Sequence, residues 1–218
     1  ESAPAANRRT GWGKAAIDGF KWAWAAAKRV GKQPGLRLFL LAYLFFNDGV
    51  QTVISMATIY GKEEIGLSEG VLIGTLLGIQ AVALVGAMLF ARLAERFGAK
   101  PALMATLACW TAIAVYGRTI ASAGEYFAMG VAVGLVLGGS QALSRSLYSR
   151  LVPKDEPAVF FGFFSVLTKL SAVFGPLVFA VIRQATGSAR PAVLALVAFF
   201  ALGMILLARV RVEEGGDA

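Results

Sequence analysis

Long apolar segments and short polar ones alternate along this chain. Six segments each hold enough mainly apolar residues, about 20, for an α-helix to cross the hydrocarbon core of a bilayer. They lie near residues 36–60, 70–91, 101–119, 125–146, 159–183 and 191–208. A backbone in lipid must satisfy its own hydrogen bonds, and the segments lack the alternation of barrel strands, so we expect helices. The pattern predicts an all-α, polytopic membrane protein whose six-helix transmembrane bundle covers residues 36–210.

The distribution of Lys and Arg predicts the orientation of this bundle. Short connections between the segments force neighbouring helices to run antiparallel. Most Lys and Arg residues then lie on one side, and the other side holds only Lys62, Arg118, Arg183 and Arg190. Because cytoplasmic loops of membrane proteins carry an excess of Lys and Arg, both ends of this chain, including the tail at 211–218, are expected in the cytoplasm.

Composition argues against several other classes of protein. Hydrophobic residues make up 57% and charged residues 16% of the chain, so a soluble fold would leave most apolar side chains without a core. The net charge of +8 does not indicate nucleic-acid binding, because the basic residues gather at the membrane edges. With one cysteine, Cys109, and no histidine, neither an internal disulfide nor a Cys-based zinc site is expected. We expect no cofactor, no metal and no nucleic-acid partner.

The residues before the first membrane segment predict two further elements. Residues 1–10 are typical of a flexible polar tether, and we interpret residue 1 as the cut edge of a longer chain. Residues 11–35 are typical of an amphipathic helix, with lysines on one face and tryptophan and other apolar side chains on the other. This helix either rests on the membrane as a linker or recognises anionic lipid specifically.

Polar side chains inside the first and fifth segments are the best candidates for function. Asn47, Asp48 and Gln51 share one face of the first helix, and the fifth carries Lys169. Asp48 and Lys169 each lie roughly 15–18 Å from the cytoplasmic start of their helices, near the midplane, where charges must be paired or hydrated. Two interpretations stay open. The two charges either line a central cavity, where they bind a charged or zwitterionic solute or exchange a proton, or form a structural ion pair.

The fourth and second segments add further candidates. Glycines recur at four-residue spacing in the fourth segment, at Gly130, Gly134 and Gly138. Such spacing lets a partner helix approach closely. Gln141 and Arg145 continue the same face. Arg145 either binds an anionic group, from a solute or from a gate carboxylate such as Glu95, or extends its charge to the membrane interface. Gln80 is a weaker cavity candidate. Because the central parts of the third and sixth segments carry no charge, a cavity is expected from the other four.

The connection between the second and third segments resembles a known signature. Residues 91–101 read ARLAERFGAKP. They are similar to the cytoplasmic loop signature of the major facilitator superfamily, G-x-L-A-D-R-x-G-R-[RK], with Ala91 for Gly, Glu95 for Asp and Ala99 for Arg. The resemblance implies that Glu95 and Arg96 keep the charge pair of a cytoplasmic gate loop. It also implies half of a twelve-helix transporter fold.

Two longer strings resemble a narrower family. Residues 45–52 (FFNDGVQT) and 138–146 (GGSQALSRS), followed by Pro153 and residues 160–162 (FFG), are similar to the C-terminal half of the autophagy-related vacuolar effluxer family. The resemblance covers about residues 36–210. It implies amino acids as the solute, a missing N-terminal six-helix half as the partner, and a cytoplasmic linker between the halves. Bacterial relatives are plasma-membrane proteins, so the inner membrane of a bacterium is expected.

These features together predict the C-terminal half of a secondary transporter that moves a small solute by alternating access. The candidate cavity residues are Asn47, Asp48, Gln51, Gln80, Gln141, Arg145 and Lys169. In this interpretation Asp48 binds the coupling proton or the solute amine, and Lys169 is its counter-charge. The alternative is a membrane scaffold or sensor that does not transport. A membrane-embedded enzyme is not expected, because the chain has no histidine and no HExxH motif.

Overall fold

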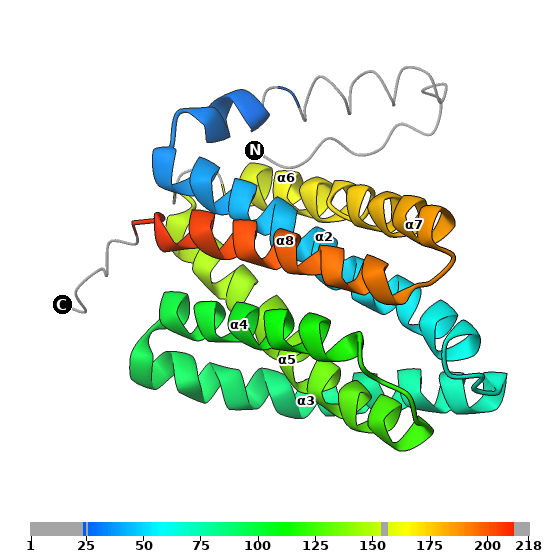
Figure 1. Cartoon of the computed structure of the whole chain (residues 1–218). Coiled ribbons are helices and arrows are strands. Elements are labelled where there is room, and N and C mark those ends of the chain that lie inside the picture. The colour runs from blue at the N-terminus through cyan, green and yellow to red at the C-terminus, as the bar shows by residue number, and fades with distance from the viewer. Residues whose placement is uncertain (1–23, 25, 154–156, 212–218) are drawn as a thin grey trace, which may run out of the picture.

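The computed structural model of the chain describes residues 24, 26–153 and 157–211. Its helices are α2 (Pro34–Glu63), α3 (Glu69–Phe97), α4 (Ala99–Gly117), α5 (Ala123–Leu151), α6 (Pro157–Leu170), α7 (Phe174–Thr186) and α8 (Arg190–Ala208). No strand occurs among the described residues (Figure 1). The all-α prediction is confirmed.

Within the described residues, six helical segments are long and apolar enough to cross a membrane: α2, α3, α4, α5, the pair α6 and α7, and α8. The prediction of a multi-pass membrane protein is therefore confirmed. α2, α3 and α5 hold 30, 29 and 29 residues, so at about 1.5 Å per residue they extend beyond the hydrocarbon core. Of the predicted amphipathic helix over 11–35, residues 26–31 are helical, while most of it, the tether and nearly all of the tail lie outside the described residues.

The fifth predicted segment, 159–183, is two helices rather than one. α6 ends at Leu170 and α7 begins at Phe174. Pro176 explains the interruption, because a proline in a helix has no N–H for the carbonyl four residues earlier, and its ring clashes with that carbonyl. Figure 1 shows α6 and α7 in line as one interrupted span, and α7 packs on both α2 and α8.

The glycine stripe of α5 packs closely against α3, as the four-residue spacing predicts. A Cβ atom added at Gly138 would lie 1.8 Å from the carbonyl oxygen of Ala83. The reciprocal contact involves Gly86 of α3, where a Cβ atom would lie 2.0 Å from the carbonyl oxygen of Leu135. The two backbones therefore touch where they cross, and a side chain on either glycine would force the helices apart.

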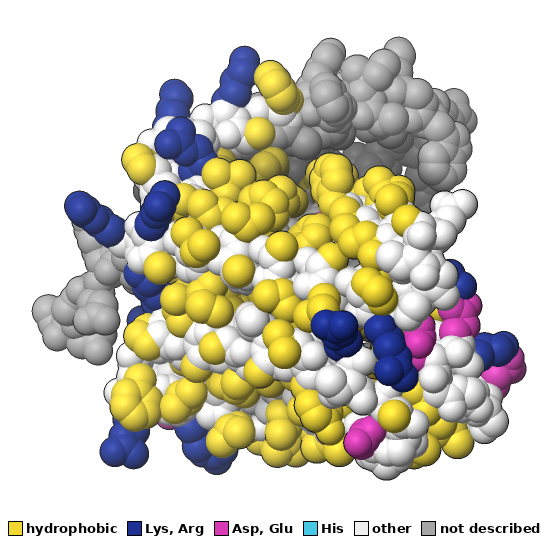
Figure 2. All heavy atoms as spheres, viewed as in Figure 1, with side chains coloured by type: hydrophobic (Ala, Val, Ile, Leu, Met, Phe, Trp, Pro, Cys, Tyr) yellow, Lys and Arg dark blue, Asp and Glu magenta, His cyan; other side chains and the backbone are white. Residues whose placement is uncertain are grey.

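Charged side chains divide between the two ends of the bundle, with an apolar flank between them (Figure 2). The basic end includes Arg37, Arg92, Lys100, Arg150 and Arg209. The acidic end includes Glu63, Glu64, Glu69 and Glu125, together with Lys62, Arg183 and Arg190. On the flank, Leu77 and Leu84 of α3 are 67% and 70% exposed, as expected for side chains that face lipid or another membrane segment rather than water.

Candidate functional site

A cavity of about 630 Å³ lies in the half of the bundle nearer the acidic end. It is bordered by α2, α3, α4, α5, α7 and α8, with mostly apolar side chains on its wall. None of the described residues that line it is acidic or basic. Its polar side chains are Gln51, Thr52, Tyr60, Thr75, Gln80, Tyr126 and Gln141.

Three of the predicted site residues meet at this cavity. Gln51 comes from α2, Gln80 from α3 and Gln141 from α5. The structure shows no hydrogen bond from any of these three side-chain amides to another described residue, so their donors and acceptors are free for a ligand. Each amide can both donate and accept, which suits a ligand that carries both kinds of group.

The other polar groups of the wall are already engaged by the protein. The hydroxyl of Tyr60 donates to the carbonyl oxygen of Gly117 at 2.6 Å, and that of Tyr126 donates to Ala57 at 3.0 Å. The hydroxyl of Thr75 donates to the carbonyl of its own helix at Val71. These bonds hold the polar side chains of the wall near the acidic end in place. The three glutamines are the polar side chains of the wall that can still bond a ligand.

Asn47 and Asp48 lie about one helical turn from Gln51 toward the basic end and do not line the cavity. Both are buried, with 4% and 2% of their surface exposed. The amide nitrogen of Asn47 donates to the hydroxyl of Ser171 at 2.6 Å, in the interruption between α6 and α7. Asp48 Oδ2 accepts a hydrogen bond of 2.7 Å from the backbone N–H of Gly175, and its Oδ1 has no partner among the described residues.

Gly175 holds α7 against α2, although its place in the sequence does not by itself indicate a functional role. A Cβ atom at this position would lie 1.9 Å from Thr52 Oγ1, so only glycine lets α7 approach α2 this closely. The hydroxyl of Thr52 in turn donates to the carbonyl of Asp48 at 2.7 Å. The signal in the sequence is the Gly175-Pro176 pair inside an apolar segment, which marks an interrupted helix and a close backbone approach.

The predicted pairing of Asp48 with Lys169 is not formed. Asp48 is bound to α7, whereas Lys169 is exposed in the last turn of α6, and no ion pair between described residues joins them. The reason is helical phase. Ser171 faces Asn47 on α2, and Lys169 lies two residues earlier, about 200° away around the helix axis.

The candidates nearer the basic end also lie apart from the cavity. Arg145 is exposed one turn beyond Gln141, within electrostatic range of the Tyr43 hydroxyl of α2. Glu95 and Arg96 are exposed at the end of α3, and Arg96 stacks over Phe97 with 5.4 Å between its guanidinium carbon and the ring centroid. The predicted charge pair between Glu95 and Arg96 is absent from the described ion pairs.

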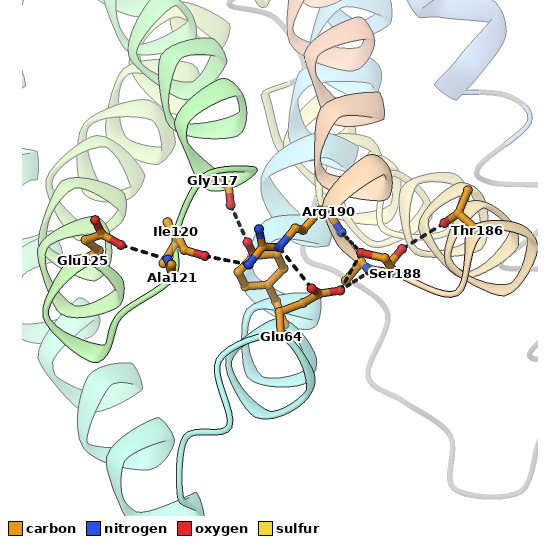
Figure 3. A network of polar contacts seen from close by, with 10 residues as sticks. Glu64, Gly117, Ile120, Ala121, Glu125, Thr186, Ser188 and Arg190 are labelled. Carbon is orange, nitrogen blue, oxygen red and sulfur yellow. Dashed lines mark hydrogen bonds and ion pairs between the residues drawn. The ribbon is translucent and has the colours of Figure 1, made fainter.

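A polar network at the acidic end ties together three connections of the bundle (Figure 3). Glu64, directly after α2, accepts hydrogen bonds from Ser188 Oγ at 2.8 Å and Ala189 N at 2.6 Å, and pairs with Arg190 Nε at 3.2 Å. Arg190 also donates to the carbonyl of Ile120 at 3.3 Å. Burial opposes the charge of Glu64, but the hydrogen bonds and Arg190 outweigh it, so the pKa of this carboxyl lies below its ordinary value.

Two arrangements that serve catalysis in other proteins, a metal cluster and a serine on a strand-to-helix turn, are absent from the described residues. No three side chains of His, Cys, Asp or Glu come together there as a metal site would need. Residues 66–70 fit the pattern Gly-x-Ser-x-Gly found in serine hydrolases, but Ser68 directly precedes α3 in a short turn that follows a helix and not a strand. The chain has no histidine to act as the base for that serine.

Comparison with known proteins places the chain in a family. A family described as "Vacuole effluxer Atg22 like" matches residues 1–218. The chain is 36% identical over 201 residues to an uncharacterized MFS-type transporter, YxiO, of Bacillus subtilis, covering 92% of this chain and 47% of that protein. It is 30% identical over 208 residues to autophagy-related protein 22 of Cryptococcus neoformans, covering 87% of this chain and 38% of that protein. The chain thus spans less than half the length of these relatives.

A solved structure shows the same fold. The crystal structure of the Escherichia coli fucose:proton symporter FucP matches with a TM-score of 0.71 at 18% sequence identity, over 86% of this chain and 45% of that one. At this identity the match concerns the arrangement of helices alone. The match over the whole chain decides the family: this protein belongs to the Atg22-like vacuole effluxer family, with a major facilitator type of fold.

Proposed function

We propose that this chain is one six-helix half of a secondary transporter that moves small solutes, with amino acids as the solute class. The observation that carries the proposal is the cavity of about 630 Å³, bordered by six helices and equipped with three free amides. Pockets for small molecules have volumes of about 300–1,000 Å³ and combine apolar walls with a few convergent polar groups. The size and lining of this cavity fit that description.

The character of the wall favours a solute that is neutral or zwitterionic and has an apolar part. A net charge placed in this cavity would lose its hydration without gaining a counter-charge from the lining residues. The amides of Gln51, Gln80 and Gln141 can donate to a carboxylate and accept from an ammonium group. An amino acid with an apolar side chain matches both features.

Asp48 is the proposed site of proton coupling. Its carboxylate lies one turn from Gln51 on α2 and accepts a hydrogen bond from the first turn of α7. Helix N-termini stabilise negative charge. Protonation of Asp48 therefore weakens the contact between α2 and α7 beside the interruption, and this links the proton to helices that border the cavity.

Alternating access requires a second bundle, which we propose is supplied by the full-length protein. Transporters of this architecture work by rocking of one helical half against the other around a central site. In this proposal Arg145 and Lys169, both exposed in this chain, face the second half or the water between the halves. The basic end lies in the cytoplasm by the positive-inside rule, and the bacterial relative favours the inner membrane.

The test is transport by the full-length protein reconstituted into liposomes, with labelled neutral amino acids on one side and a pH gradient. Substitutions Gln51→Leu and Gln141→Leu are expected to raise the half-saturating solute concentration about tenfold, because each removes a hydrogen bond to the solute. Gln184→Leu is the matched control, since Gln184 is exposed on α7 and does not line the cavity. Absence of transport above that of empty liposomes would overturn the proposal.

A further inference from the structure

A second hollow lies at the basic end, apart from the cavity described above. It has a volume of about 870 Å³ and lies where the start of α4 meets the ends of α5 and α8. Four of its lining side chains are basic: Lys100, Arg150, Arg209 and Arg211. None of its described lining residues is acidic. The hollow therefore combines concave shape with charge of a single sign.

The arginines of this hollow have no counter-charge among the described residues. No ion pair or side-chain hydrogen bond with a described residue involves Arg150, Arg209 or Arg211. Lys100 is held in place, because its ammonium donates to the carbonyl oxygens of Ala208 at 2.8 Å and Val210 at 2.7 Å. Lys100 is thus held by the backbone, and none of the three guanidinium groups is paired with an acidic side chain in the part of the chain that the structure describes.

The backbone adds to this charge. Gly98 has a φ of 92° and precedes α4, so the first N–H groups of that helix begin at Ala99 on the wall of the hollow. The N-terminus of a helix carries partial positive charge and offers free N–H donors to anions. Guanidinium groups add planar pairs of donors that match two oxygens of a phosphate.

We propose that this hollow binds a phosphate group, with the headgroup of an anionic phospholipid as its source. The location argues for lipid, because the hollow lies at the ends of membrane-spanning helices, where headgroups lie, and Pro101 and Leu147 add apolar wall. Basic pockets between transmembrane helices recognise such headgroups. Dissolved phosphate offers the same chemistry, and the experiment separates the two sources.

The test measures binding of phosphatidylglycerol, phosphatidylcholine and inorganic phosphate to the purified full-length protein in detergent, by native mass spectrometry and thermal shift. Wild-type protein is expected to prefer phosphatidylglycerol to phosphatidylcholine. Arg150→Gln/Arg209→Gln is expected to weaken phosphatidylglycerol binding about 25-fold. Arg150→Lys/Arg209→Lys keeps the charge but loses the planar donors, so an intermediate loss of phosphatidylglycerol affinity is expected. This variant replaces the glutamine variant in the test if the latter does not fold.

The matched control is Arg92→Gln/Arg118→Gln, which removes the same charge from two exposed arginines that do not line the hollow. Its lipid binding should equal that of the wild type. A different outcome would assign the site to a dissolved anion. In that case the wild type binds inorganic phosphate but shows no preference for phosphatidylglycerol, and Arg150→Gln/Arg209→Gln abolishes the phosphate binding. Equal weakening by both double variants, or binding unaffected by Arg150→Gln/Arg209→Gln, would overturn the proposal.

Discussion

The carboxylate of Asp48 on α2 accepts a hydrogen bond of 2.7 Å from the backbone N–H of Gly175 in the first turn of α7. This bond joins the only buried carboxylate of the described residues to the interruption of the fifth membrane span. The free N–H groups at the start of a helix stabilise a negative charge, so α7 provides the compensation that Lys169 does not. The bond therefore couples the charge state of Asp48 to the contact between two helices that border the cavity.

Asp48→Asn should separate coupling from folding. The asparagine side chain is nearly the same size, and its amide oxygen still accepts from Gly175 but without a negative charge, so the melting temperature should fall by less than in Asp48→Ala. Without an ionisable group at this position, transport driven by a pH gradient should fall to the level of empty liposomes, while exchange of solute without a gradient persists. Both rates are measured with full-length protein in liposomes.

The informative comparison is Asp48→Ala, which removes the acceptor altogether. It leaves the N–H of Gly175 buried without a partner and should destabilise the protein by about 1–3 kcal/mol. Gradient-driven transport by Asp48→Asn at the wild-type rate would show that Asp48 is a structural residue and that the coupling group lies elsewhere.

Most of the fold was predictable because the bilayer imposes it. Apolar length alone identifies the six spans, and the glycine spacing of α5 identifies a close partner helix, which is α3. The interruption of the fifth span was missed, since hydropathy stays high across residues 171–173 and does not report backbone hydrogen bonds. Pro176 was the available signal, but a proline inside a membrane helix is often tolerated without a break.

The site was predictable only in part, because residues on one face of a helix do not always meet the same environment. Asn47, Asp48 and Gln51 share a face of α2, yet α7 crosses that face at Asp48, and the cavity begins at Gln51. Depth in the membrane suggested that Asp48 and Lys169 meet, but depth does not determine direction around the axis. The network around Glu64 joins residues 124 to 126 positions apart, and no local pattern indicates such contacts.

Gly138→Ala should destabilise the packing of α3 on α5. The added Cβ atom would lie 1.8 Å from the carbonyl oxygen of Ala83, and backbone atoms cannot rotate away as a side chain does. The expected loss is about 1–3 kcal/mol, seen as a lower melting temperature in detergent. Gly78→Ala on α3 is the control, because no atom lies within 4 Å of its added Cβ, and it should leave the melting temperature unchanged or slightly raised. Similar losses in both variants would contradict the close crossing.

Glu64→Gln should lower the stability of the acidic end, and the loss should depend on pH. The amide cannot pair with the charge of Arg190, so we expect a loss of about 1–2 kcal/mol at neutral pH. The pKa of Glu64 lies below its ordinary value in the folded protein, so its contribution is complete above the ordinary carboxyl pKa of 4.5 and disappears as the pH falls through the folded-state value. The difference in melting temperature between wild type and Glu64→Gln should therefore shrink as the pH falls below about 4.5.

The exposed ion pair between Lys62 and Glu69 provides the control for this pH dependence. Its two side chains are 62% and 77% exposed, and solvent screens such a pair. Glu69→Gln should produce no measurable change in melting temperature at neutral pH. A difference between wild type and Glu64→Gln that stays constant down to pH 3 would show that Glu64 acts through packing and not through its charge.

Gly175→Ala and Thr52→Ala should be strongly non-additive. The Cβ atom of an alanine at position 175 would lie 1.9 Å from Thr52 Oγ1, which forces α7 away from α2 and breaks the bond from Gly175 to Asp48. The single variant Gly175→Ala should therefore lose about 1–3 kcal/mol of stability and also lose gradient-driven transport. Thr52→Ala removes only a hydroxyl that bonds within its own helix, and its loss should be small.

In the double variant the clashing oxygen is absent, so α7 can return toward α2. Its loss of stability should be smaller than the sum of the two single losses by at least about 0.5 kcal/mol, the lower end of coupling energies for residues in contact. Some strain remains, because the added Cβ would still lie 3.0 Å from the carbonyl oxygen of Asp48. Partial recovery of gradient-driven transport together with stability would connect the helix crossing to function. Strictly additive losses would mean that α2 and α7 do not approach each other through these two residues.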